Sequence, residues 1–344
     1  MLPGCLAAGT FGTVVPIGGH GSDLALDEKR GVVYVANYTG NRVEVVSTAT
    51  RTLQTSLNVA AQPASLALSP DGRYLVVTHY GNFQAPNTPS NAVTVLELNG
   101  NLKQTFTFGS PPLGVAFGLD NLAFIVTMRD FVLLDPSNGS TRVLETVAGV
   151  TAKLLPVPAG TFPPEIVRAS VAASGDGLWV YGVAETGAPD KAVVFRYNVY
   201  NKQVLPLYWT ASPPLGPRVT SVNQDGSLYL TGWGLFSRQG MLLAQFHSAS
   251  GKFNIGSHAI DSSRGLVYLQ YDELDTAWPP NLIVAEADNL AVRERLRLPE
   301  NLAGKSLLSA DGEVMYSISD SGLAVLPVGA LSRTPRVAAA QEDV

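Results

Sequence analysis

The chain has 344 residues, of which 46% are hydrophobic and only 15% are charged, and its formal net charge at pH 7 is −5. The negative charge, together with the lack of any Lys/Arg cluster longer than two adjacent residues, argues against a phosphate-binding patch, so we expect no nucleic-acid partner. No stretch approaches the roughly 20 uninterrupted apolar residues of a membrane-spanning helix, which predicts no transmembrane segment. The 33 glycines and 23 prolines are typical of a protein with many short strands and turns.

The first twelve residues carry the single cysteine, Cys5, so the chain holds no internal disulfide. The segment Leu2-Pro3-Gly4-Cys5 resembles the end of a bacterial lipoprotein signal, but neither a basic region nor an apolar region precedes it. The sequence as given therefore predicts no signal peptide, and residues 1–12 are interpreted as a leader.

The clearest structural signal lies between residues 31 and 47, where two apolar runs flank a polar turn. Val33, Tyr34 and Val35 precede the turn Asn37-Tyr38-Thr39-Gly40-Asn41, and a second run of valines follows it. Runs of β-branched and aromatic residues bounded by Gly and Asn indicate two antiparallel strands joined by a short loop.

This hairpin belongs to a unit that recurs along the chain: an apolar strand, a turn that often reads Asp-Gly, an aromatic-centred strand, a loop, a third strand, a small polar turn and a fourth strand. Seven units share it, and their second strands carry Tyr34, Tyr74, Phe124, Trp179, Tyr229, Tyr268 and Tyr316. A mean spacing of about 47 residues, without helical periodicity, is the signature of a β-propeller. We therefore predict an all-β, seven-bladed β-propeller with four antiparallel strands per blade; hairpins in a β-sandwich are the alternative.

The ends of the chain must close this ring, because an open edge strand invites aggregation. The seventh unit supplies three strands and runs out near Val328, whereas residues 13–17 form an apolar strand with nothing local to pair with. We expect this N-terminal strand to become the outer strand of the seventh blade. The predicted propeller then spans residues 13–330, and residues 331–344 are expected to be a disordered tail or a linker.

The second strand of the first unit resembles the bacterial YVTN β-propeller repeat family. The matching segments are Tyr34-Val35-Ala36-Asn37, Gly40-Asn41 and Val43-Glu44-Val45-Val46, with Ser69-Pro70-Asp71-Gly72-Arg73 in the second unit. The resemblance covers residues 13–330, closely in the first two units and faintly towards the end. It implies the propeller fold and a bacterial cell-envelope or secreted protein. Lactonase-type propellers share this pattern, so function follows from it only loosely.

Functional side chains are expected at one face of the ring. The loops that lead into each inner strand gather there with the loops between second and third strands, and we call it the loop face; the Asp-Gly turns lie on the opposite, turn face. The candidate ligand-binding residues on the loop face are His20, His79, Phe83, Arg129, Trp233, Tyr271, Asp272 and Trp278.

Three kinds of chemistry are open to these residues. Phe83, Trp233 and Trp278 could form an aromatic platform on which a sugar or a peptide stacks. His79 with Glu273, assisted by Arg129, could supply the acid–base pair of a lactonase-like hydrolysis. His20, His79 and Asp272 could hold Ca²⁺ or Zn²⁺, although isolated histidines carry no ligand spacing, and we expect no cofactor. Solvated loop residues are the plain interpretation of each set.

We interpret the chain as a non-enzymatic binding scaffold that presents the loop face to a protein or a surface polysaccharide. A lactonase-like hydrolase and a structural spacer are the alternatives. The resemblance favours an extracytoplasmic location, in the periplasm, on the cell surface or outside the cell. A monomeric domain of a larger protein is the expected assembly.

Overall fold

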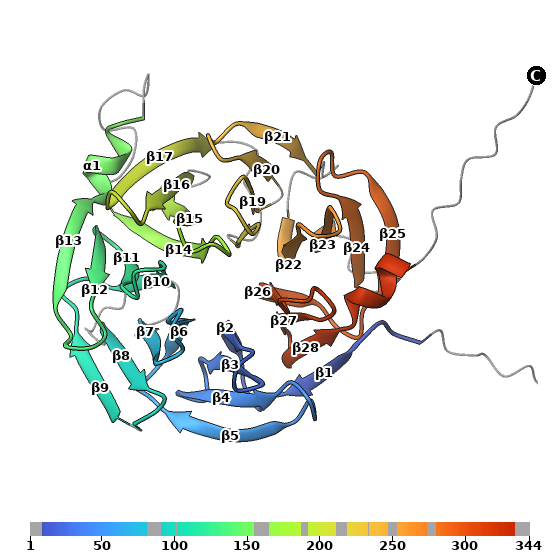
Figure 1. The fold of residues 1–344 in the computed structure, drawn as a ribbon, viewed down its shortest axis with the longest axis horizontal. Helices are drawn as coiled ribbons and strands as arrows, with labels where there is room; N and C mark the ends of the chain where they lie inside the picture. The colour runs from blue at the N-terminus through green and yellow to red at the C-terminus, as the bar shows by residue number, and fades with distance from the viewer. Residues whose placement is uncertain are drawn as a thin grey trace, which may run out of the picture.

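The computed structural model describes residues 9–80, 91–100, 102–154, 165–186, 192–210, 219–232, 234–246, 253–273 and 280–333. They form a ring of seven antiparallel sheets of four strands each, with the innermost strand of every sheet facing a central channel (Figure 1). The predicted seven-bladed β-propeller is confirmed.

Each blade runs outwards in chain order from its inner strand. Blade 1 comprises β2 (Gly21–Asp27), β3 (Val32–Asn37), β4 (Arg42–Ser47) and β5 (Leu53–Asn58). Blade 2 comprises β6 (Pro63–Leu68), β7 (Tyr74–His79), β8 (Ala92–Glu97) and β9 (Leu102–Thr107). Blade 3 comprises β10 (Pro112–Phe117), β11 (Ala123–Thr127), β12 (Asp130–Leu134) and β13 (Thr141–Thr146). Blade 4 comprises β14 (Ile166–Ala173), β15 (Trp179–Thr186), β16 (Ala192–Asn198) and β17 (Gln203–Thr210).

The remaining blades follow the same order until the last. Blade 5 comprises β18 (Thr220–Val222), β19 (Leu228–Thr231), β20 (Gly234–Ser237) and β21 (Leu242–Gln245). Blade 6 comprises β22 (Phe253–Asp261), β23 (Leu266–Glu273), β24 (Asn281–Glu286) and β25 (Val292–Arg297). Blade 7 comprises β26 (Leu302–Leu308), β27 (Met315–Ser319), β28 (Gly322–Leu326) and β1 (Thr13–Pro16).

The Asp-Gly turns join inner strands to second strands, as the sequence predicts. In blade 7, the Asp311 carboxylate accepts hydrogen bonds from Ser309 Oγ at 2.6 Å and from the backbone N–H of Glu313 at 3.0 Å. The bond from Ser309 leads the causes that lower the pKa of Asp311. Gly312 follows at φ +69°, a left-handed conformation that glycine adopts without strain. These local bonds explain why the Asp-Gly pair marks the turn in several units.

The ring closes through β1, as predicted. β1 pairs antiparallel with β28, with Val15 opposite Leu323 (Figure 1). Val15 and Ile17 are buried in a cluster that joins blade 7 to blade 1. Asn37, the last residue of the Tyr-Val-Ala-Asn segment, donates to the Ile17 carbonyl at 3.1 Å and to Glu44 at 2.9 Å. This asparagine therefore fastens the first blade to the closing strand.

Among the described residues, helices interrupt the all-β pattern at two places. α1 (Val147–Thr151) follows the outer strand of blade 3, and the Thr146 hydroxyl caps it by accepting from the Gly149 N–H at 2.9 Å. A 3₁₀ helix, η1 (Val328–Arg333), follows β28. Both are too short to produce a helical period in the sequence. Within the described segments, no helix has the length and apolar character needed to cross a membrane.

Removal of residues 1–18 should destabilise the ring. The truncation takes away β1 and exposes the edge of β28, and burial of a valine or isoleucine side chain is worth about 1.5–3 kcal/mol. We expect the free energy of unfolding to fall by at least about 3 kcal/mol, measured by urea denaturation. Val15→Asp should reproduce most of the loss, whereas Thr13→Asp, at an exposed position of the same strand, should change little. An unchanged midpoint for the truncated chain contradicts closure by β1.

Candidate functional site

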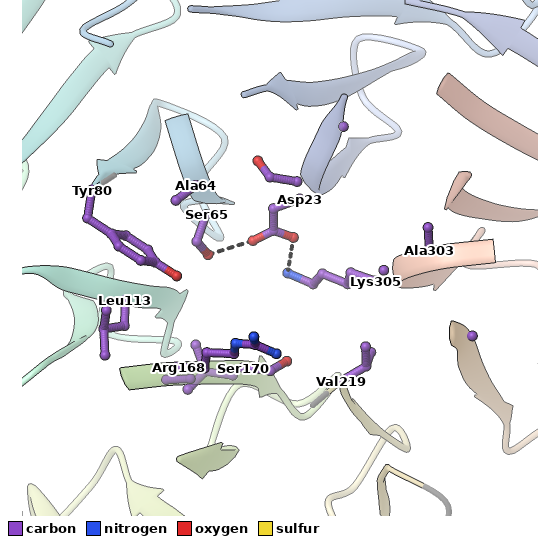
Figure 2. Close-up of a pocket in the computed structure, with 16 residues that line it drawn as sticks. Asp23, Ala64, Ser65, Tyr80, Leu113, Arg168, Ser170, Val219, Ala303 and Lys305 are labelled. Atoms are coloured by element: carbon purple, nitrogen blue, oxygen red, sulfur yellow. Dashed lines mark hydrogen bonds and ion pairs between the residues drawn. The ribbon is translucent and has the colours of Figure 1, made fainter. Parts of the chain in front are cut away.

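A cavity of about 390 Å³ lies in the channel at the loop face. Residues in or next to all seven inner strands line it, with Tyr80, which follows β7. Figure 2 shows its polar side chains around a common centre. They include Asp23, Ser65, Tyr80, Arg168 and Lys305. The volume falls in the range of pockets that hold a small molecule or one inserted side chain.

Asp23 connects three blades at the wall of this cavity. Its Oδ2 accepts from Ser65 Oγ at 2.5 Å and from the Leu66 N–H at 3.0 Å, both on β6. Its Oδ1 lies 3.3 Å from the Lys305 ammonium on β26 and accepts from the Leu24 N–H. The aspartate side chain is only 9% exposed, so these bonds replace lost hydration. Asp23 therefore both holds three blades together and lines the cavity.

Local irregularities in the inner strands direct these side chains. The pairing register between the inner and second strands shifts immediately before Asp23, Ser65 and Arg168, next to the first paired residue of β2, β6 and β14. A β-bulge of this kind bends a strand and redirects the next side chain. The repeated bulge explains why three equivalent positions reach the same cavity.

The cationic side chains approach the cavity from opposite sides of the ring. Figure 2 shows the Arg168 guanidinium, from blade 4, and the Lys305 ammonium, from blade 7, directed towards the interior. Arg168 is 53% exposed and lies 3.9 Å from Glu185, whereas Lys305 is 16% exposed. The Tyr80 hydroxyl also faces the cavity, and burial raises the pKa of this phenol, so it remains a neutral hydrogen-bond donor.

His79 does not occupy the open position expected from the sequence. Its side chain is fully buried in blade 2, with Nε2 2.9 Å from Thr94 Oγ1 and Nδ1 3.2 Å from the Ala61 carbonyl. Burial lowers the pKa of His79 to about 4, so the ring is neutral at physiological pH. The expectation that His79 serves as a metal ligand or an acid–base group is therefore corrected: the residue links the strands of its own blade.

The other sequence-predicted residues do not line the cavity or fall outside the described part of the chain. His20 is exposed, and its backbone N–H donates to Thr39. Arg129 is 65% exposed and pairs with Glu165 at 2.7 Å. Phe83, Trp233 and Trp278 lie outside the described residues, as do the side chains of Tyr271, Asp272 and Glu273. The aromatic platform and the hydrolytic pair thus remain hypotheses from the sequence.

In the described segments, no three His, Cys, Asp or Glu side chains group as they would around a metal ion. The cavity residues that the sequence analysis missed are Asp23, Ser65 and Arg168. Their signal was a charged or hydroxyl side chain at the start of an inner strand otherwise composed of small apolar residues. The candidates predicted from the sequence were instead taken from loops.

A second cavity, of about 570 Å³, opens at the turn face and is lined mainly by small side chains. Ser221 lies at its wall, with Oγ 2.7 Å from Nδ1 of the buried His258. The Ser221 hydroxyl donates to the His258 carbonyl at 2.6 Å, so its proton is not directed at the imidazole. This pair ties β18 to β22 and lacks the arrangement of a serine nucleophile with its base.

No protein-family model and no curated protein matches the chain. Among solved structures, it is similar to hydrazine synthase of Kuenenia stuttgartiensis, with a TM-score of 0.63, 12% identity and coverage of 95% of this chain and 99% of that one. It is also similar to the β-propeller domain of Myceliophteria thermophila Cps50 (Swd1), with a TM-score of 0.62, 13% identity and coverage of 90% and 96%. U3-55K gives a TM-score of 0.64 at 12% identity, with coverage of 90% and 96%. At these identities the likeness shows the propeller fold alone.

Replacement of Asp23 should weaken the ring at the cavity. Asp23→Ala leaves the buried Leu66 N–H without its acceptor and removes the partner of Lys305. Because the loss of one member of a buried ion pair typically costs 3–5 kcal/mol, we expect a fall of about 3 kcal/mol in the free energy of unfolding. Asp23→Asn keeps an acceptor oxygen and should lose less. Equal stability of Asp23→Ala and the parent chain contradicts the structural role.

Stability should also depend on pH through the buried histidines. Burial lowers the pKa of His79 and of His258 to about 4, against 6.5 in the unfolded chain. Below pH 6.5 the unfolded state binds more protons, so stability falls with falling pH until about pH 4. Each histidine contributes a slope of about 1.4 kcal/mol per pH unit within this window. We expect urea unfolding between pH 5 and 7 to show that His79→Gln loses about half of the histidine-dependent slope of the free energy of unfolding against pH. A slope identical to that of the parent chain refutes the assignment.

Proposed function

We propose that the chain is a non-enzymatic binding scaffold whose loop face receives a protein partner. The observation that carries this proposal is the loop-face cavity, where Arg168 and Lys305 face the interior from blades 4 and 7. Both residues lie on inner strands, so the cavity is preformed. Binding of a ligand therefore costs little free energy for ordering the site. Preformed concave sites with a few converging polar groups are typical of binding surfaces.

The described polar groups suit recognition better than hydrolysis. The Asp23 carboxylate accepts three hydrogen bonds and pairs with Lys305, so its oxygens are already engaged within the ring. His79, the proposed acid–base partner of Glu273, is buried with both ring nitrogens bonded inside blade 2. A general base must reach the proton that it abstracts. These contacts favour the scaffold over the lactonase-like alternative.

We propose, further, that the chain is a bacterial YVTN-type propeller that works outside the cytoplasm. The support is the Tyr34–Asn37 segment and the Ser69–Arg73 turn, together with the confirmed propeller fold. Fractionation of the source cells, followed by immunodetection, tests the location. Recovery of the protein in the cytoplasmic fraction alone contradicts it.

A bulky residue at the loop face should block the partner. Ala303 is exposed and lines the loop-face cavity, so Ala303→Trp should fill the mouth without disturbing the core. Ala310 is exposed at the turn-face cavity of the same blade, which makes Ala310→Trp a matched control. We expect affinity capture from an extract of the source cells to retain a specific protein on the parent chain and on Ala310→Trp, and to lose it on Ala303→Trp.

Equal capture by Ala303→Trp and the parent chain contradicts the proposal, as does loss with Ala310→Trp alone. Failure of the parent chain to retain any specific protein also contradicts it and favours the spacer alternative. Circular dichroism and thermal melting of both variants establish that they are folded.

A further inference from the structure

We infer that the loop-face cavity receives a carboxylate side chain of an acidic peptide segment in the partner. The inference rests on the proposed function, because it specifies the group that the partner inserts. Three kinds of donor converge on the cavity: the Arg168 guanidinium, the Lys305 ammonium and the Tyr80 hydroxyl. Such donors bind an oxyanion through charge-assisted hydrogen bonds.

The charge of the cavity wall matches a single negative charge. Arg168 and Lys305 contribute two positive charges and Asp23 contributes one negative charge, so these lining residues carry a net charge of one positive. Glu185, on the second strand of blade 4 and outside the lining, lies 3.9 Å from Arg168 and partly offsets its charge. A singly charged carboxylate therefore suits this wall better than a phosphate dianion, which adds repulsion from Asp23 and Glu185.

Arg168 is the residue best placed to contact the ligand directly. Both cations pair with a carboxylate, Arg168 with Glu185 at 3.9 Å and Lys305 with Asp23 at 3.3 Å, but the Arg168 side chain is 53% exposed and that of Lys305 only 16%. The planar guanidinium can bind both oxygens of a carboxylate, and this geometry is the reason that arginine dominates carboxylate recognition. We therefore assign Arg168 the main contact and Lys305 a supporting charge.

The lining favours a peptide over an acidic sugar. Tyr80 is the sole aromatic residue of the described lining and is only 3% exposed, so it offers a hydroxyl but no ring face for a sugar to stack on. Leu113, Val219 and Ala64 provide apolar wall beside the cations. A glutamate side chain, with two methylene groups before its carboxylate, matches this combination.

The test measures binding of fluorescent hexaglutamate to the purified full chain by anisotropy at low salt. We expect saturable binding of hexaglutamate, none of hexaglutamine, and weaker binding as salt is raised. Arg168→Gln should lower the affinity by about tenfold or more, the equivalent of one lost hydrogen bond between charged groups. Arg73→Gln is the matched control, because Arg73 is 51% exposed and pairs with Glu97 at 3.6 Å, outside the cavity lining. It should leave the affinity within about twofold, as expected for a distant surface charge.

Tyr80→Phe provides a second variant that keeps the buried ring and removes only the hydroxyl; it should weaken hexaglutamate binding about threefold or more. The inference is overturned if hexaglutamate does not bind, if Arg73→Gln weakens binding as much as Arg168→Gln, or if neither cavity variant changes the affinity. Binding of trigalacturonate without hexaglutamate overturns the peptide assignment in favour of an acidic sugar, and binding of inorganic phosphate alone overturns the carboxylate assignment. If hexaglutamate does not bind but Ala303→Trp still loses the captured protein, this inference fails and the scaffold proposal stands.

Discussion

Closure of the ring by β1 is the constraint on which the rest of the structure depends. An unpaired strand edge exposes hydrogen-bonding groups, and the pairing of β1 with β28 covers the edge of β28 and gives blade 7 its fourth strand from the other end of the chain. Within the closed ring, neighbouring inner strands lie close together. At Gly114 on β10, an added Cβ would lie 3.3 Å from Val171 Cγ2 on β14, so the inner ring has little space for large side chains.

Small polar side chains bind the inner strands to one another. Ser65 Oγ accepts from the Val115 N–H at 3.4 Å, and Ser170 Oγ accepts from the Thr220 N–H at 3.1 Å. Further round the ring, the Ser257 and Ser306 hydroxyls lie 2.6 Å apart. Asp23 belongs to the same set, since it accepts from the Leu66 N–H. The groups that hold neighbouring blades together therefore also form the wall of the channel, which gives the cavity a rigid shape.

The fold could be predicted from the sequence because its signals are local. The Asp-Gly turns and the second-strand aromatics repeat in phase, and all seven of these aromatics lie in second strands. Their registers differ, however: Tyr34 lies in the middle of β3, whereas Tyr74 and Trp179 begin β7 and β15. The aromatic marks the strand and not a fixed position within it, so spacing alone could not align the blades residue by residue.

The cavity could not be predicted residue by residue. The sequence pointed to loops at one face, whereas residues of the inner strands line the cavity, because the direction of each side chain depends on bulges and on burial. His79 is the last residue of β7, next to a loop, where the sequence suggests an exposed ligand-binding side chain. Its side chain is instead buried and bonded to Thr94. Arg168 and Asp23, separated by more than a hundred residues, meet at one cavity because the ring brings the starts of blades 1 and 4 to the same channel. No local pattern encodes that meeting.

The central claim is that the loop face receives the partner, and hydrogen–deuterium exchange of the chain with its captured partner tests it most directly. The account predicts slower exchange on binding in the loop-face segments 18–22, 128–130 and 301–304, with no change in the turn segments 69–73 and 309–313. Protection confined to the turn segments or to the outer strands, with the loop face unchanged, would contradict the account.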